Sequence, residues 1–274
     1  MKYLLSLALV GICFFSQAQT HQVTKLWETG PIFAVPESVF ADMKNKTLYV
    51  SLINGSPSVA DGKGGVARLS LDGSKADTNW VTGLNAPKGM GKFGKKLYVA
   101  DLAEVVVIDI RSGKILQKIA VPGARVFNDI TIDSKGIIYV SDSAAGKIYR
   151  IVDSKAEIFI DSAPSVNGLK SVGNELFVLT GRAVQKVAPD KSLVKLADGL
   201  VAGLDGIEPM GNGDFLISSW SGVLQYLYAD GKFETLLDTR ADRSNIADIG
   251  YDPKKKIIYV PTFSKRTVVA FQLN

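Results

Sequence analysis

Short apolar strands alternate with polar, turn-rich segments along the whole chain, and the pattern repeats about every 40 residues. Six strand cores share a large side chain between two aliphatic or aromatic neighbours: Leu48-Tyr49-Val50, Leu97-Tyr98-Val99, Ile138-Tyr139-Val140, Leu176-Phe177-Val178, Phe215-Leu216-Ile217 and Ile258-Tyr259-Val260. Successive cores lie 49, 41, 38, 39 and 43 residues apart. A period of this length, built from short strands, is typical of a propeller with one blade per repeat. The sequence therefore predicts an all-β fold, a six-bladed β-propeller.

The two ends of the chain are predicted to meet in the last blade. Residues 267–271 read as the third strand of that blade, and residues 23–27 can pair with it as its outer strand. Such pairing covers a sheet edge that would otherwise stay open. No linker composition interrupts the repeats, so residues 19–274 are expected to form a single propeller domain.

The lead-in to each strand core carries the candidate chemistry. Ten to twelve residues before the cores, one register position reads Glu37, Lys88, Asn128, Asn167, Asp205 and Ala247. Because each blade begins its innermost strand beside the central channel, residues in one register converge there. Four of the six have side-chain oxygens, which suits a hard divalent cation, best Ca²⁺, with Mg²⁺, Mn²⁺ or Zn²⁺ as alternatives.

A simpler interpretation of the same residues also stands. Asn167-Gly168 and Asp205-Gly206 are ordinary turn dipeptides, and each pair could do no more than form the bend into an inner strand.

The first 18 residues have the pattern of a secretory signal, with Lys2, an apolar run over residues 4–15 and a small-residue cleavage site ending at Ala18. The apolar run is short for a bilayer span, so export to the periplasm or the medium is expected, without membrane insertion. A lipid anchor at Cys13 is disfavoured, because Ile12 stands where a small residue would be needed.

Composition excludes several function classes. Cys13 is the only cysteine and His21 the only histidine, so a Ser-His-Asp or Cys-His arrangement and a His-rich zinc site are not available. The net charge is +5 with lysines spread over every repeat, which argues against a nucleic-acid partner. A small-molecule ligand and a monomeric protein are expected.

The chain resembles the gluconolactonase/regucalcin (senescence marker protein) family of six-bladed propellers over essentially its whole mature length. The matching stretches are Pro36-Glu37-Ser38-Val39-Phe40, Phe127-Asn128-Asp129-Ile130-Thr131-Ile132-Asp133, Val166-Asn167-Gly168-Leu169 and Leu204-Asp205-Gly206-Ile207. The resemblance implies that Glu37, Asn128, Asn167 and Asp205 bind a catalytic divalent metal. It also implies metal-assisted hydrolysis of a sugar lactone or related ester, with Asp205 as general base.

Two positions depart from that pattern. Lys88 places a cation in the register; it is either a solvated lysine with its head in the channel water, or a contact to a substrate carboxylate or oxyanion, or a charge that replaces the metal. Arg125 lies near the place of a substrate-contacting arginine in the family, but one residue out of step with Asn128.

Two other functions stay open. The propeller could be a non-catalytic binding protein for a protein or glycan, which Lys88 favours, whereas the four ligand residues favour an enzyme. Alternatively, the same site could hydrolyse an organophosphate or aryl ester.

Overall fold

The computed structural model describes residues 21–274, so the predicted signal segment and Cys13 lie outside the described residues. None of the described helical structure is long and apolar enough to cross a membrane.

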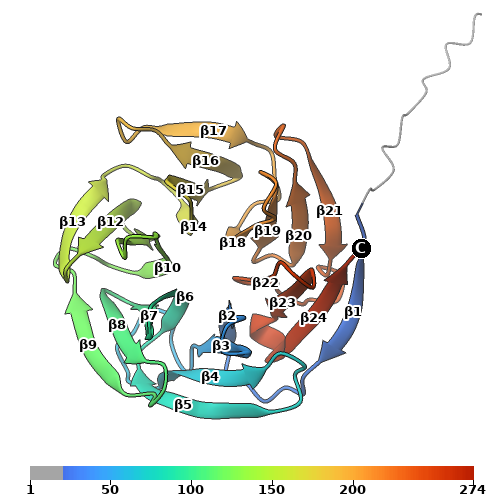
Figure 1. The fold of residues 1–274 in the computed structure, drawn as a ribbon, viewed down its shortest axis with the longest axis horizontal. Coiled ribbons are helices and arrows are strands. Elements are labelled where there is room, and N and C mark those ends of the chain that lie inside the picture. Colours follow the sequence, from blue (N-terminus) through green and yellow to red (C-terminus); the bar gives the residue numbers. More distant parts are fainter. Residues whose placement is uncertain (1–20) are drawn as a thin grey trace, which may run out of the picture.

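The described residues form six four-stranded antiparallel sheets arranged around a central axis (Figure 1). The first three blades contain β2 (Pro36–Asp42), β3 (Thr47–Leu52), β4 (Gly64–Ser70) and β5 (Ala76–Leu84); β6 (Pro87–Phe93), β7 (Lys96–Asp101), β8 (Glu104–Asp109) and β9 (Ile115–Ala120); and β10 (Phe127–Ile132), β11 (Ile138–Asp142), β12 (Lys147–Val152) and β13 (Lys155–Ile160). The next two contain β14 (Val166–Val172), β15 (Glu175–Thr180), β16 (Ala183–Val187) and β17 (Leu193–Ala197); and β18 (Leu204–Pro209), β19 (Phe215–Ser219), β20 (Val223–Leu227) and β21 (Phe233–Asp238). The sixth contains β22 (Gly250–Asp252), β23 (Ile257–Pro261), β24 (Val268–Leu273) and β1 (Val23–Glu28), with one 3-10 turn, η1 (Phe263–Lys265). The predicted six-bladed propeller is therefore confirmed.

The ring closes through its first strand, as predicted. β1 pairs antiparallel with β24, from Val23 opposite Leu273 to Glu28 opposite Val269. Trp27 in β1 packs on Tyr259 of β23, with the ring centroids 6.0 Å apart. The last blade thus takes strands from both ends of the chain, and its outer edge is covered.

Each pair of neighbouring blades shares one apolar cluster, so six clusters complete the ring. The recurrent tyrosines of the strand cores lie in these clusters, with Tyr49 between blades 1 and 2 and Tyr259 between blades 6 and 1. A blade cannot bury both faces by itself, so its stability depends on its neighbours.

His21 lies on the outside of the ring. Its ring stacks on Tyr226 with the centroids 4.0 Å apart, and Nδ1 is 2.7 Å from Glu234 Oε1 on the outer strand of blade 5. The only histidine of the chain is thus held away from the channel.

Candidate functional site

The inner strands carry a β-bulge at the register position that the sequence singled out. In β6, β10, β14 and β18, the pairing with the second strand slips over two residues: Lys88-Gly89, Asn128-Asp129, Asn167-Gly168 and Asp205-Gly206. These residues lie within strands, and neither Gly168 nor Gly206 has a positive φ. The interpretation as simple turn dipeptides is therefore wrong. A bulge interrupts the ladder and changes the direction in which its side chains point, so the bulges distinguish this register position from the rest of each inner strand.

The glycines of these pairs allow neighbouring inner strands to approach. A Cβ atom on Gly168 would lie 2.3 Å from the carbonyl oxygen of Asp205, and one on Gly206 would lie 2.6 Å from Asp248 Oδ1. Glycine is therefore required by close backbone contact across the blades and not by turn geometry.

Serines on the second strands satisfy the backbone N–H groups that the bulges leave without ladder partners. The hydroxyl oxygens of Ser51, Ser141 and Ser218 accept hydrogen bonds from the N–H groups of Ser38, Asp129 and Gly206 at 3.0, 2.9 and 2.7 Å. All three serines are fully buried. The same device thus fixes the backbone in blades 1, 3 and 5.

Two oxygens in the ring have no hydrogen-bond partner among the described residues, although both are buried. They are Glu37 Oε2 and Asn167 Oδ1. Asn167 Nδ2 donates to Asp205 Oδ1 at 2.9 Å, which leaves the amide oxygen as the free end of the side chain. Glu37 and Asp205 are only 5% and 3% exposed. Buried acceptors without a donor are costly, and a bound cation would remove that cost.

The carboxyl groups of the ring favour the neutral form when no cation is bound. Burial raises the pKa of Asp205 to about 8, the charge of Asp248 adds to this, and the hydrogen bond from Asn167 opposes it. Burial, followed by the charge of Asp205, raises the pKa of Glu37 well above its usual range. Positive charge in the channel would reverse both effects.

Lys88 places a positive charge near these carboxyl groups, but its ammonium group is hydrogen-bonded to backbone carbonyls. Its Nζ donates to the carbonyl oxygens of Pro57 and Ala86, both at 3.1 Å, and the residue is 6% exposed. The interpretation as a lysine solvated by channel water is therefore wrong. Burial lowers the pKa of Lys88, and the carboxylate of Glu37 opposes the shift. Pro57 belongs to the loop that joins β3 to β4 in blade 1, so Lys88 also connects that loop to the inner strand of blade 2.

Sequence reasoning missed two further carboxyl groups, Asp129 and Asp248, each one residue after the register position. Asp129 Oδ1 and Oδ2 accept the N–H groups of Ile130 and Leu169 at 2.7 and 2.6 Å. Asp248 Oδ2 accepts the Ser38 hydroxyl at 2.5 Å, and burial raises the pKa of Asp248 to about 7. Their position directly after a register residue was the available signal in the sequence. Because both carboxyl groups accept hydrogen bonds from neighbouring inner strands, they hold those strands together around the channel.

Asn128 lies in the bulge of β10 and is half-buried, in register with Asn167 and Asp205. Arg125 is exposed in the preceding loop, and its guanidinium donates to the carbonyl oxygen of Ala144 at 3.3 Å. Nothing in the local sequence distinguishes Arg125 from an ordinary loop arginine. Within residues 21–274, Arg125 makes no side-chain hydrogen bond to the ring residues, and its predicted substrate contact stays a prediction.

The donor set in the channel fits a hard cation only if amides take part. Within the part of the chain that the structure describes, no three acidic, histidine or cysteine side chains lie close enough to hold a metal alone. Glu37 and Asp205 supply carboxylate oxygens, and Asn128 and Asn167 can supply amide oxygens. This mixture is what Ca²⁺ accepts, and two charges would balance a divalent ion. The assignment of the four as ligands stays a prediction.

No protein-family model matches the sequence, and no curated protein matches it significantly. Solved structures with the same fold include a putative gluconolactonase, with a TM-score of 0.69, 14% identity and coverage of 94% of this chain and 93% of that one. A gluconolactonase from Xanthomonas campestris has a TM-score of 0.65 and 17% identity over 88% and 87% of the two chains. An auxiliary nutrient binding protein from Bacteroides thetaiotaomicron has a TM-score of 0.67 and 12% identity over 94% and 78%. At these identities the likeness shows the fold, which is the one that the family resemblance implied.

Proposed function

We propose that this protein is an exported, metal-dependent hydrolase that opens a sugar lactone or a related ester at the entrance of the central channel. The observation that carries the proposal is the pair of buried, unpartnered oxygens, Glu37 Oε2 and Asn167 Oδ1, beside Asp205. A purely structural ring would be expected to satisfy these acceptors with donors of its own.

Glu37, Asn128, Asn167 and Asp205 would hold the cation, with Ca²⁺ as the first candidate. When bound, a divalent cation would polarise the substrate carbonyl and stabilise the negative charge that develops on its oxygen. Proton transfer and contact with the substrate would be carried out by side chains of the channel.

Asp205 would take the proton from the attacking water. A general base works best when its pKa lies near the working pH, and burial already raises that of Asp205 to about 8. The hydrogen bond from Asn167 holds the Asp205 carboxyl in one orientation and favours its charged form. A lactone is an activated ester, so no nucleophilic cysteine or serine-histidine pair is required.

Lys88 would contact the substrate from the side of blade 2. Two of its three N–H groups are used by Pro57 and Ala86, so one donor remains for a carboxylate or a developing oxyanion. The tie to Pro57 keeps the entrance loop of blade 1 next to this donor.

A non-catalytic binding propeller is the second candidate, and the buried charge of Lys88 favours it. The Lys88 ammonium group interacts electrostatically with Glu37 and Asp205, so it supplies part of the positive charge that a cation would bring. In that case the entrance face would bind a protein or glycan without turnover.

The test is a hydrolysis assay on the purified mature protein with sugar lactones, an aryl ester and a phosphotriester. We expect lactone turnover that is lost with EDTA, restored by Ca²⁺ and absent in Asp205→Asn. Turnover of only the phosphotriester or the aryl ester would support the proposed catalytic site but replace the lactone as its substrate. No turnover of any substrate by calcium-loaded protein would overturn the enzyme and leave the binding propeller.

A further inference from the structure

A cleft of about 680 Å³ opens between blades 1 and 2 on the face opposite the channel entrance. It is bordered by the β2–β3, β6–β7 and β8–β9 turns, all of which lie where the inner strands end. Its volume is in the range of small-molecule sites. The cleft shares no residue with the register position of the channel.

The cleft is lined by five basic residues, Lys44, Arg68, Lys92, Lys95 and Arg111, and by one acidic residue, Asp109. Two of the basic residues are paired: Lys92 with Asp42 at 2.5 Å, and Arg68 with Asp77 at 3.2 Å. In the described part of the chain, Lys44, Lys95 and Arg111 form no ion pair within 4.0 Å. The cleft therefore has a surplus of positive charge.

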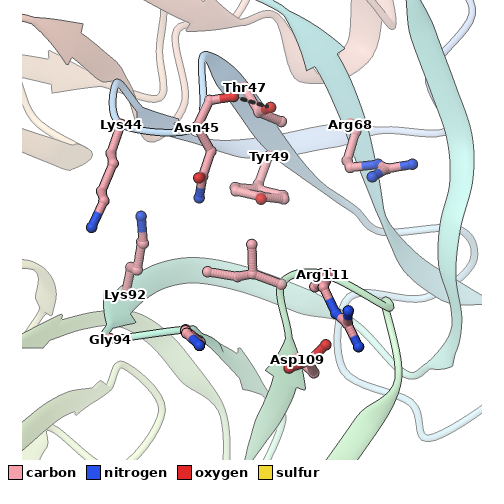
Figure 2. Close-up of a pocket in the computed structure, with 11 residues that line it drawn as sticks. Lys44, Asn45, Thr47, Tyr49, Arg68, Lys92, Gly94, Asp109 and Arg111 are labelled. Atoms are coloured by element: carbon pink, nitrogen blue, oxygen red, sulfur yellow. Dashed lines mark hydrogen bonds between the residues drawn. The ribbon is translucent and has the colours of Figure 1, made fainter.

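The charges stand on two sides of a central tyrosine. Figure 2 shows Lys44 and Lys92 on one side of the cleft, Arg68 and Arg111 on the other, and Tyr49 between them. The Arg68 guanidinium lies over the Trp80 ring at 5.3 Å, and Trp80 packs on Tyr49, so this side of the cleft is held in place. A ligand that reaches from one side to the other meets a cation at each end.

Tyr49 is 2% exposed as a residue and lines the cleft, and its hydroxyl makes no hydrogen bond to another side chain or backbone group within residues 21–274. Burial raises its pKa to about 12, so the hydroxyl stays protonated and can donate at neutral pH. Packing of the ring between the blades requires only an apolar face. The Tyr49 hydroxyl is not one of the buried polar atoms that lack a partner, so it is accessible from the cleft and can donate a hydrogen bond to a ligand bound there.

We propose that this cleft is a binding site for a phosphate-bearing anion with two anionic groups, one placed between Lys44 and Lys92 and the other at Arg111. The guanidinium group of arginine and the ammonium group of lysine are the usual partners of phosphate oxygens. The Tyr49 hydroxyl donates to the segment that joins the two groups. The same chemistry occurs in soluble sugar phosphates and in lipid headgroups, and the experiment separates these sources.

The probe is inorganic pyrophosphate, titrated into the mature protein by calorimetry at low ionic strength. We expect saturable binding that weakens roughly tenfold or more in Lys44→Ala/Arg111→Ala. Lys254→Ala/Lys255→Ala is the matched control, because it removes the same charge from a turn on the same face and should change affinity less than about twofold. Tyr49→Phe should weaken binding about threefold with unchanged melting temperature, since only the hydroxyl is lost.

No binding of pyrophosphate by the wild type would overturn the proposal. An equal loss of pyrophosphate affinity in the two double variants would also overturn it. Such a result would mean that pyrophosphate is attracted by the total positive charge of this face and not by the cleft. Sedimentation with vesicles that contain phosphatidic acid separates the sources. Vesicle binding that pyrophosphate reverses supports a lipid headgroup, and pyrophosphate binding without vesicle binding supports a soluble ligand. Hydrolysis in the channel should be unchanged in all these variants.

Discussion

The side-chain amide of Asn167 donates a hydrogen bond to Asp205 Oδ1 at 2.9 Å, across the boundary between blades 4 and 5. The two residues are 38 positions apart in sequence. The bond uses the donor end of the amide and leaves Asn167 Oδ1 buried without a partner. One contact therefore orients both a candidate base and a candidate ligand.

Replacing Asp205 by Asn should abolish tight cation binding. The change keeps the size of the side chain but removes one of two carboxylates, and we expect Ca²⁺ affinity to fall by at least roughly 100-fold. Calorimetric titration measures the loss. Asp190→Asn, an exposed carboxylate in a turn, is the control and should bind as the wild type does. Equal Ca²⁺ affinity in the Asp205 and Asp190 variants would remove Asp205 from the ligand set.

Replacing Lys88 by Met should strengthen cation binding and weaken catalysis. The apolar stem is kept, whereas a positive charge that acts on Glu37 and Asp205 is lost. We expect Ca²⁺ affinity to rise about tenfold, because close like charges repel strongly in a buried site. Lys191→Met, at an exposed turn, should leave affinity unchanged. Binding that occurs only in the Lys88 variant would mean that the lysine takes the place of the metal, against our proposal.

The cation-free protein should lose stability as the pH rises. The pKa values of Asp205 and Asp248 are raised to about 8 and about 7 in the folded protein. A carboxyl with a raised folded-state pKa contributes stability that is complete below its unfolded value near 4 and is lost as the pH passes the folded value. Urea unfolding in EDTA should therefore show a free energy that falls between pH 4 and pH 8.

Asp205→Asn is the matched variant for this pH dependence. In this variant the unfolding free energy should decrease less between pH 4 and pH 8 than in the wild type. Excess Ca²⁺ should also reduce this decrease, because the cation favours the charged carboxylates. A wild-type stability that rises over this range in EDTA would contradict the assignment of buried, neutral carboxyl groups.

Replacing Gly168 by Ala should damage both the fold and the site. The added Cβ would meet the Asp205 carbonyl oxygen at 2.3 Å and Leu179 Cδ1 at 2.6 Å, so the inner strands of blades 4 and 5 must separate. We expect a loss of about 1–3 kcal/mol in unfolding free energy and weaker Ca²⁺ binding. Gly30→Ala is the control, since its nearest atom is Ile32 Cγ2 at 3.7 Å. Equal stability of the two variants would show that the close approach is not required.

Replacing Ser218 by Ala should destabilise the bulge that presents Asp205. The serine accepts the Gly206 N–H at 2.7 Å and donates to the Ala247 carbonyl at 2.8 Å, with no exposed surface. Leaving a buried N–H without a partner costs about 1–3 kcal/mol. Chemical denaturation measures the change, with the exposed Ser58→Ala as the control. A cost below that of normal surface substitutions would mean that water replaces the hydroxyl.

The sequence determined the fold class, because a 40-residue period of short apolar strands leaves few other ways to bury one face per repeat. It also located the register of Glu37, Asn128, Asn167 and Asp205, since equal spacing from the strand cores brings equal positions to the axis. Closure by the N-terminal strand followed from the unpaired edge of the last blade.

The tertiary structure alone decided how these residues are presented. The bulges and the serine partners depend on the register between consecutive strands of a blade, and the role of Gly168 depends on contact with the inner strand of the next blade. The same is true of Lys88, whose charge was visible but whose carbonyl partners Pro57 and Ala86 were not. Asp129 and Asp248 lie next to the register position, and only the tertiary structure shows their contacts with neighbouring inner strands. Asp129 binds the N–H of Leu169, 40 residues further on, and Asp248 contacts Ser38, 210 residues earlier. Burial and charge then set their protonation, and neither quantity is defined until the ring is closed.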